Sequence, residues 1–317
     1  MLTAVLGLTG ALIFGSADFL GGLAAKRMSS LLVTAVAAAS GLVALLLTLP
    51  FVAGVWSPTA VLWGGLSGVS GAIAISLLYA CLAIGPMSIL SPLTAVVSAV
   101  VPMTVGLAGG DRLAPIGYWA LGLALVAVVL VGFVPERGAV RPSLLGVLMA
   151  LGSGTMIGAF MVMIDLTPAD SGLVPLVMNR AVNASIMFSV VGLLALVALR
   201  RRRALVPARS DSDSDSDSDS ASASASMPAT DAPPPPRSTL AIGLRLAVAC
   251  GVIDVLANVL LLLGMRAGDL SVMSVLTAMY PAGTILLAAV VLRERIAPVQ
   301  WLGLALALTA AGMLALA

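Results

Sequence analysis

Long apolar runs, separated by short polar or Gly/Pro-rich breaks, dominate the pattern of this chain. The first run, 2–24, matches the ~20 residues that a helix needs to cross a bilayer core. A transmembrane barrel would instead alternate over segments of about ten residues, so the pattern predicts helices. We expect ten spans, at 2–24, 31–53, 60–84, 88–109, 114–134, 143–165, 172–199, 240–265, 270–292 and 298–316.

One segment, from Arg200 to about Thr239, departs from this pattern. It contains four consecutive arginines, a Ser/Asp repeat, an Ala/Ser repeat and four consecutive prolines. Because it has few apolar residues to bury, we expect a disordered connector. A phosphorylated or cation-binding segment is the alternative, and an inert linker is the favoured interpretation.

The composition fits an integral membrane protein. Hydrophobic residues make up 60% and charged residues 9% of the chain, against roughly 25% charged residues in soluble domains. The first run exceeds the core of a signal peptide and lacks a basic start, so we expect a retained helix. Cys81 and Cys250 fall inside apolar runs, where a cysteine serves as a small buried hydrophobe. We expect a multi-pass protein of the plasma (inner) membrane.

The chain also contains an internal repeat. The charged turn Asp111-Arg-Leu-Ala-Pro115 recurs near the end of the chain as Glu294-Arg-Ile-Ala-Pro298. The same offset pairs Gly85, Ser88 and 93–95 with Gly268, Ser271 and 276–278, and a two-residue slip then pairs 121–125 with 302–306. A weaker match, at a shorter offset, pairs Gly7, 11–12 and Gly15 with Gly146, 150–151 and Gly154. We therefore expect two repeats, 1–135 and 143–317, the second interrupted at about 200–239.

Five helices in each repeat have a geometric consequence. After an odd number of crossings, the second repeat enters the membrane from the opposite side. The expected fold class is thus an all-α integral membrane protein of ten transmembrane helices, arranged as two inverted five-helix repeats. In transporters of this plan the substrate site lies near the midplane between the repeats, and the repeats rock to give alternating access.

Several segments resemble EamA-type members of the drug/metabolite transporter superfamily. They are 14–22 in the first helix and the unit of 276–281, 293–295 and 302–304 near the end of the chain. The resemblance implies a transporter for amino acids, nucleosides, sugars or drugs. The first repeat departs from the pattern because Ser98 stands where the second repeat has Pro281. We therefore expect its fourth helix to bend differently.

The orientation in the membrane has two interpretations. Lysine and arginine are concentrated in the odd-numbered loops, and the even-numbered loops carry only Arg112 and Arg266. Because positive loops stay in the cytoplasm, this distribution predicts that both termini lie outside. The resemblance to the superfamily implies that both termini lie inside.

Polar groups within the spans are the candidates for a substrate site, since a charge at the bilayer centre costs at least ~2.5–3.5 kcal/mol. Asp18 lies in the first helix, and Asp254 lies mid-span in the eighth with Asn258 one turn further on. Because a low-dielectric interior favours a neutral carboxyl group, Asp254 is a candidate for binding and releasing protons. A snorkelling carboxylate, an ion pair or a structural hydrogen bond is the alternative.

The seventh helix adds Arg180, which keeps its charge and must face a carboxylate, carbonyl groups or an anionic substrate group. An ion pair with Asp18 or Asp254 is weighed equally with a ligand role. An acid and a guanidinium together would suit a zwitterion. Two tyrosines are candidates for the cavity lining or for simple packing. The expected substrate-binding residues are Asp18, Tyr79, Asn179, Arg180, Asn183, Asp254, Asn258 and Tyr280.

Missing motifs exclude other classes. The chain has no histidine and no Walker loop, so zinc-protease, Ser-His-Asp and ATP-driven mechanisms are excluded. No cofactor, metal, nucleic acid or enzymatic activity is expected. We expect a secondary-active exporter of small metabolites or drugs that exchanges protons, with a small-molecule substrate, the lipid bilayer and protons as partners. The oligomeric state stays open. The alternatives are an uncoupled facilitator of amino acids or sugars, a membrane scaffold recruited through the Ser/Asp-rich loop, and an intramembrane enzyme.

Overall fold

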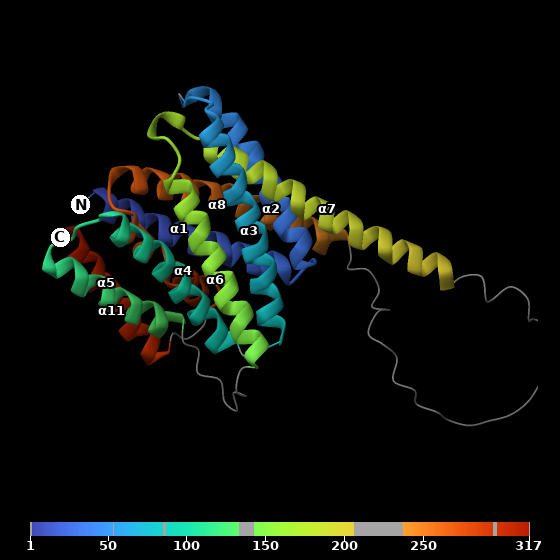
Figure 1. The fold of residues 1–317 in the computed structure, drawn as a ribbon. Coiled ribbons are helices and arrows are strands. Elements are labelled where there is room, and N and C mark those ends of the chain that lie inside the picture. Colours follow the sequence, from blue (N-terminus) through green and yellow to red (C-terminus); the bar gives the residue numbers. More distant parts are fainter. Residues whose placement is uncertain are drawn as a thin grey trace, which may run out of the picture.

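Helices account for nearly all of the described structure. The computed structural model describes residues 2–52, 54–84, 87–132, 143–205, 237–293 and 297–316, and these ranges contain no strand. The range of the first expected repeat holds α1 (Leu2–Ala25), α2 (Ser30–Thr48), η1 (Leu49–Phe51), α3 (Pro58–Ile84), α4 (Met87–Gly109) and α5 (Pro115–Gly132). The range of the second holds α6 (Leu144–Asp165), η2 (Ala169–Ser171), α7 (Val174–Leu205), α8 (Arg237–Ala267), α9 (Leu270–Thr277), α10 (Tyr280–Val291) and α11 (Pro298–Leu316). Figure 1 shows them as one bundle.

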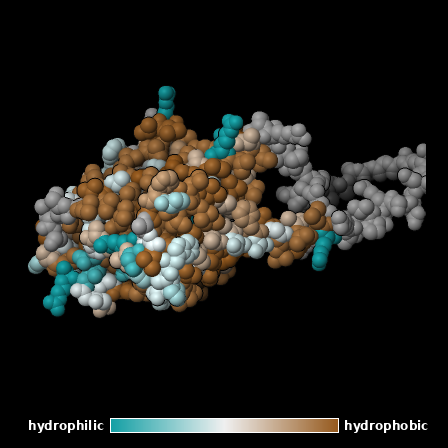
Figure 2. Space-filling view, turned by 90° about the horizontal axis from the view of Figure 1, so that it is seen from above, coloured by the Kyte–Doolittle hydropathy of each residue, from teal (hydrophilic) through white to brown (hydrophobic). Residues whose placement is uncertain are grey.

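Seven helical segments of the described chain are long and apolar enough to cross a membrane, counting α9 and α10 as one span. Three further apolar segments are shorter, at Leu93–Gly109, Pro115–Val131 and Pro298–Leu314. The face of the molecule seen in Figure 2 is covered largely by hydrophobic side chains. Val290, for example, exposes 76% of its surface, which a lipid environment tolerates and water does not. The protein is therefore a multi-pass membrane protein, and a count of ten spans stays a prediction.

The expected boundary at Arg200 is wrong by about one turn and a half. α7 continues to Leu205 through the arginine cluster, and α8 begins at Arg237. Arginine is a good helix former, and positive charge at the C-terminal end of a helix interacts favourably with the helix dipole. The rest of the predicted connector, 206–236, lies outside the described residues.

The ninth predicted span is interrupted. α9 ends at Thr277 and α10 starts at Tyr280, with Pro281 in the first turn of α10. Proline has no N–H to donate and restricts the residue before it, so it ends one helix and suits the start of the next. In the first repeat, where Ser98 stands in that place, α4 runs unbroken from Met87 to Gly109. The expected difference between the two helices is thus present.

The main helix contacts correspond to one another when the helices of the two expected repeats are exchanged. α1 packs on α8 and α6 packs on α3, while α2 packs on α8 and α7 packs on α3. α4 packs on α6 as α10 packs on α1. α2–α7, α4–α9 and α5–α11 are contacts between equivalent helices.

Two glycines that the weaker sequence match pairs make equivalent close approaches. A Cβ atom at Gly15 would overlap the backbone of α10 at Tyr280 and Thr284. A Cβ atom at Gly154 would overlap α4 at Thr94 and Val97. The offset that relates the two charged turns also pairs Val97 with Tyr280. One sequence offset therefore pairs the two glycines, and the other pairs residues that these glycines approach. Small residues are what allow transmembrane helices to approach this closely.

Candidate functional site

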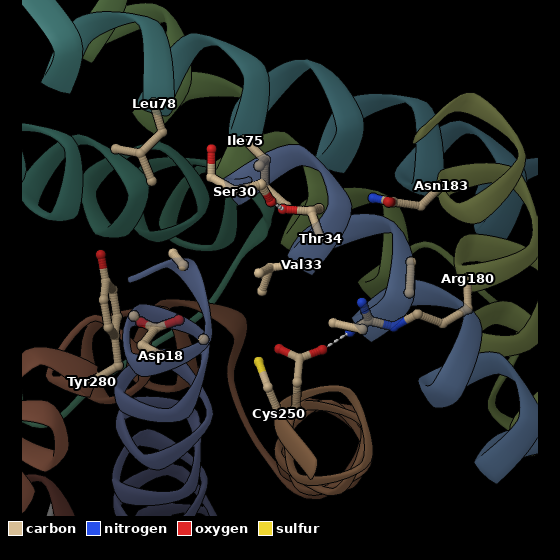
Figure 3. A pocket seen from close by; sticks show the side chains of 16 residues that line it. Asp18, Ser30, Val33, Thr34, Ile75, Leu78, Arg180, Asn183, Cys250 and Tyr280 are labelled. Atoms are coloured by element: carbon tan, nitrogen blue, oxygen red, sulfur yellow. Dashed lines mark hydrogen bonds and ion pairs between the residues drawn. The ribbon is translucent and has the colours of Figure 1, made fainter. Parts of the chain in front are cut away.

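A cavity of about 350 Å³ lies among α1, α2, α3, α7, α8 and α10. Its wall includes Asp18, Arg180 and Asp254, the ionisable groups expected from the sequence, together with Tyr280 and Cys250 (Figure 3). The lining extends to Ala25 and Ser30, which flank the connection between α1 and α2. The cavity thus combines side chains from both halves of the chain and reaches toward one end of the bundle.

Arg180 and Asp254 form an ion pair across the cavity between α7 and α8 (Figure 3). The Asn258 side chain, one turn after Asp254, donates a hydrogen bond to the same carboxylate at 3.2 Å and another to the Asp254 carbonyl at 2.8 Å. The ion pair that the sequence left open is therefore formed with Asp254 and not with Asp18. It fixes a positive and a negative charge against each other beside the cavity.

Asp18 lies on the opposite wall, on α1. Its side chain is exposed to the cavity, and among the described residues it has no hydrogen bond or ion pair. Gly15 brings this part of α1 against the first turn of α10, where the Thr284 hydroxyl donates to the Gly15 carbonyl at 3.1 Å. The same approach places Asp18 beside Tyr280 (Figure 3). The break before α10 and the glycine on α1 together build this corner.

The two further asparagines of α7 take different places. Asn183 is buried and borders the main cavity. Asn179 is buried and donates to the Ser67 hydroxyl of α3 at 2.9 Å, while also bordering a smaller hollow of about 150 Å³. Tyr79 belongs to α3, but its side chain lies outside the described residues.

A second chamber of about 210 Å³ continues from the first and shares Asp18, Asp254 and Tyr280 with it. Most of its other lining residues are apolar or aromatic: Phe14, Ile75, Leu78, Ile157, Phe160, Met161 and Leu261. Thr277 also borders it, and its hydroxyl is buried without a hydrogen-bond partner in the described structure. The sequence analysis missed these residues, because an apolar side chain facing a cavity cannot be distinguished in sequence from one facing lipid.

At the other end of the bundle, polar contacts join the two halves of the chain. The Asp111 carboxylate of the repeated turn accepts a hydrogen bond at 3.0 Å from the backbone N–H of Ser271, in the first turn of α9. The Val55 N–H donates to the Asp170 carbonyl, also at 3.0 Å. Here burial and the negative charge of Asp111 raise the pKa of Asp269, which lies outside the spans. Residues 294–296 of the second copy of the turn lie outside the described residues.

No cluster of three or more histidine, cysteine or acidic side chains within the described ranges is placed to hold a metal ion. The ionisable groups of the cavity instead divide into one closed ion pair and one separate carboxylate. This arrangement can bind a polar or charged molecule without a cofactor.

The fold and the cavity define a class, a helical membrane protein with a polar chamber between its helices. Residues 223–316 match the sequence model of the EamA-like transporter family, so the expected resemblance is confirmed over these residues. The family belongs to the drug/metabolite transporter superfamily, whose members are membrane transporters and not enzymes.

Solved structures support the fold over the whole length. Twenty-six solved chains match, among them one titled only "Crystal structure of protein", with a TM-score of 0.62 and 16% sequence identity. The match covers 99% of this chain and 98% of the other. No curated protein matches the chain.

Proposed function

We propose that this protein is a secondary transporter that exports a small metabolite or drug by alternating access, in exchange for protons. The observation that carries the proposal is the chamber between the two repeats, with ionisable groups deep in the membrane region and a lining that reaches the connection between α1 and α2. Intramembrane charges that face a cavity are typical of substrate and ion pathways.

The proposal includes two inverted repeats, 1–135 and 143–317. The exchange symmetry of the main helix contacts supports it, since the contacts of α1 with α8 and α10 correspond to those of α6 with α3 and α4. The matched approaches of Gly15 and Gly154 support it at the level of residues. An inverted repeat can rock about a central site and expose it to either side in turn.

Asp111 then serves as a contact that holds the far end closed. Its hydrogen bond to Ser271 N–H links the turn between α4 and α5 to the start of α9, and these elements belong to different repeats. A single carboxylate-to-amide bond is worth a few kcal/mol at most, so it can break and reform during a transport cycle. The chamber would open at this end when it breaks.

Asp18 is the better candidate for proton exchange. The sequence favoured Asp254, but Arg180 neutralises Asp254 in the ion pair. Asp18 faces the chamber with no such partner in the described structure. A group that binds and releases a proton during transport has to be reachable from the chamber and free to change its charge.

The proposed experiment uses purified protein in proteoliposomes that contain a pH dye, with a panel of amino acids and amines added outside. Proton exchange is supported if the substrate causes a pH change in the wild type and if Asp18→Asn abolishes this change. Asp254→Asn should only reduce it, because it breaks the ion pair with Arg180. If labelled substrate moves at equal rates in the wild type and in Asp18→Asn without a pH change, the protein is an uncoupled facilitator.

A scaffold role is the second candidate from a different class. It depends on the Ser/Asp-rich segment, so deleting 206–236 separates the two functions. A transporter keeps its flux after the deletion, whereas a scaffold loses its partner. An intramembrane enzyme would need a pair of catalytic groups, and within the described residues the cavity offers only one carboxylate that is not already in an ion pair.

We also propose that the protein lies in the plasma membrane. The side of the membrane on which its termini lie has two interpretations: the charge distribution predicts that both are outside, and the family resemblance implies that both are inside. A reporter that is active only in the cytoplasm, fused after Ala317, distinguishes the two orientations.

A further inference from the structure

We propose, building on the transport function above, that the substrate is an organic monocation with an apolar or aromatic body. Its cationic group pairs with Asp18, and its body occupies the chamber beside Phe14, Ile157 and Phe160.

Within the part of the chain that the structure describes, the charges around the cavity leave one negative charge without a counterpart. Asp18, Asp254 and Arg180 are its charged lining residues. Asp254 and Arg180 cancel each other in their ion pair, which Asn258 supports with a hydrogen bond. The carboxylate of Asp18 therefore attracts a single positive charge, and a second acid nearby disfavours an anion.

The shape of the cavity adds the second requirement. The chamber that continues past Asp18 has a volume of about 210 Å³ and is walled mainly by aliphatic and aromatic side chains. Apolar walls with a few fixed polar groups are typical of sites for drug-sized organic molecules. Tyr280 stands beside Asp18 (Figure 3), and aromatic rings next to a carboxylate suit an ammonium group.

The repeat explains why the two ends of the cavity differ. The sequence offset that aligns Gly15 with Gly154 also aligns Asp18 with Ile157. Both side chains line the second chamber, one acidic and one aliphatic. Equivalent positions of the two repeats thus supply the charged end and the apolar end of the same site.

A zwitterion fits this arrangement less well than a cation does. Its carboxylate would need the guanidinium of Arg180, which Asp254 already occupies. Removing Arg180 from that pair would leave the Asp254 carboxylate without a counter-ion, which is unfavourable in a partly buried site. Binding of a simple cation leaves the pair intact.

Three probes that share a phenyl ring and a short chain test the inference. They are (2-phenylethyl)trimethylammonium, phenylalanine and 3-phenylpropionate, which carry a positive charge, both charges and a negative charge. Binding to the purified full-length protein is measured by protection of the Cys250 thiol from alkylation in a Cys81→Ala background, because Cys250 lines the cavity and Cys81 is buried. Flux of the same probes is measured in proteoliposomes.

The cation is expected to protect Cys250 and to be transported, whereas the anion does neither. Asp18→Asn should weaken cation binding about tenfold or more, and Asp18→Glu, which keeps the charge, should retain most of it. Unfolding temperatures of both variants check that they are folded.

Equal or tighter binding of phenylalanine or phenylpropionate, no binding of the cation at millimolar concentration, or unchanged binding in folded Asp18→Asn would each overturn the inference. Transport of phenylalanine without the cation would leave the transporter proposal standing and remove only the substrate class. If none of the probes or of the wider panel moves, the transport proposal itself fails.

Discussion

The Arg180–Asp254 ion pair controls how many charges the cavity presents. Its side chains are 15% and 26% exposed, so water reaches them only in part and each charge depends on the other. Sequence reasoning identified Arg180 as a residue that needs a partner, because an arginine within a span cannot lose its charge. It could not choose between Asp18 and Asp254, since that choice depends on how α1, α7 and α8 pack.

Breaking this pair should destabilise the protein. We expect Arg180→Gln to lower the free energy of unfolding by about 2–4 kcal/mol, because it leaves the Asp254 carboxylate without its cation. The double variant Arg180→Gln/Asp254→Asn should be more stable than Arg180→Gln alone. Unfolding midpoints in detergent measure the order. Asp18→Asn is the control and should not destabilise the protein, since it removes a carboxylate that has no partner in the described structure. If the effects of Arg180→Gln and Asp254→Asn on stability simply add, the expected coupling between the two residues is absent.

At the scale of the elements, close helix approach is fixed by glycine. The sequence paired Gly15 with Gly154 by their offset. It could not tell which helix each glycine contacts, because the contacts join segments far apart in the chain. Gly15 meets α10 and Gly154 meets α4, and these are equivalent helices.

Gly15→Ala should therefore destabilise the protein by about 1–3 kcal/mol, since its Cβ atom would have to displace backbone atoms of α10. Gly22→Ala is the matched control on the same helix. A Cβ atom at Gly22 meets no atom within 4 Å, and alanine favours the helix. Thermal unfolding of both variants in detergent gives the comparison, and equal losses would show that the α1–α10 contact is not tight.

The start of α9 carries a pH dependence. The pKa of Asp269 is raised by burial and by Asp111. The native state therefore binds the Asp269 proton more tightly than the unfolded chain does. The protonated Asp269 carboxyl group stabilises the folded state fully when the pH is below its ordinary pKa of 3.8. This contribution is lost as pH rises through the raised pKa.

Asp269→Asn should consequently raise the unfolding temperature at pH 7 relative to the wild type, and this gain should disappear as the pH approaches 4. Asp111→Asn should reduce the same pH dependence while weakening the contact with Ser271 N–H. Unfolding temperatures across pH 4–8 in detergent test this expectation. A constant difference between Asp269→Asn and the wild type at every pH would contradict it.

At the scale of the whole molecule, the long apolar runs were enough to predict a helical membrane protein, and most predicted spans coincide with helices to within a few residues. The family resemblance was also readable, from 276–281 and its flanking segments. The cavity was only partly predictable. Its charged residues stand out in an apolar sequence, whereas Phe14, Ile157 and Phe160 look like any other lipid-facing or core residues until the helices are assembled.

The direction in which the cavity is reached can be tested with the two native cysteines. Cys250 borders the cavity, and Cys81 is fully buried. We expect a membrane-impermeant thiol reagent to label Cys250, and faster from the side of the connection between α1 and α2. Single-cysteine variants Cys81→Ala and Cys250→Ala in right-side-out and inverted vesicles separate the signals. Equal labelling of the two cysteines, or faster labelling of Cys250 from the opposite side, would exclude this geometry.

The placement of Asp18 opposite Ile157 has a consequence for how such a protein can evolve. A transporter assembled from two copies of one five-helix chain would have the same residue at this position in both copies, because any mutation appears twice. It would therefore carry two acids here or none. Joining the copies in one chain frees each position to change alone. In the proposed repeats one of the two positions is the acid Asp18 and the other is the aliphatic Ile157, so a dimer of either repeat alone would have a different charge in its centre.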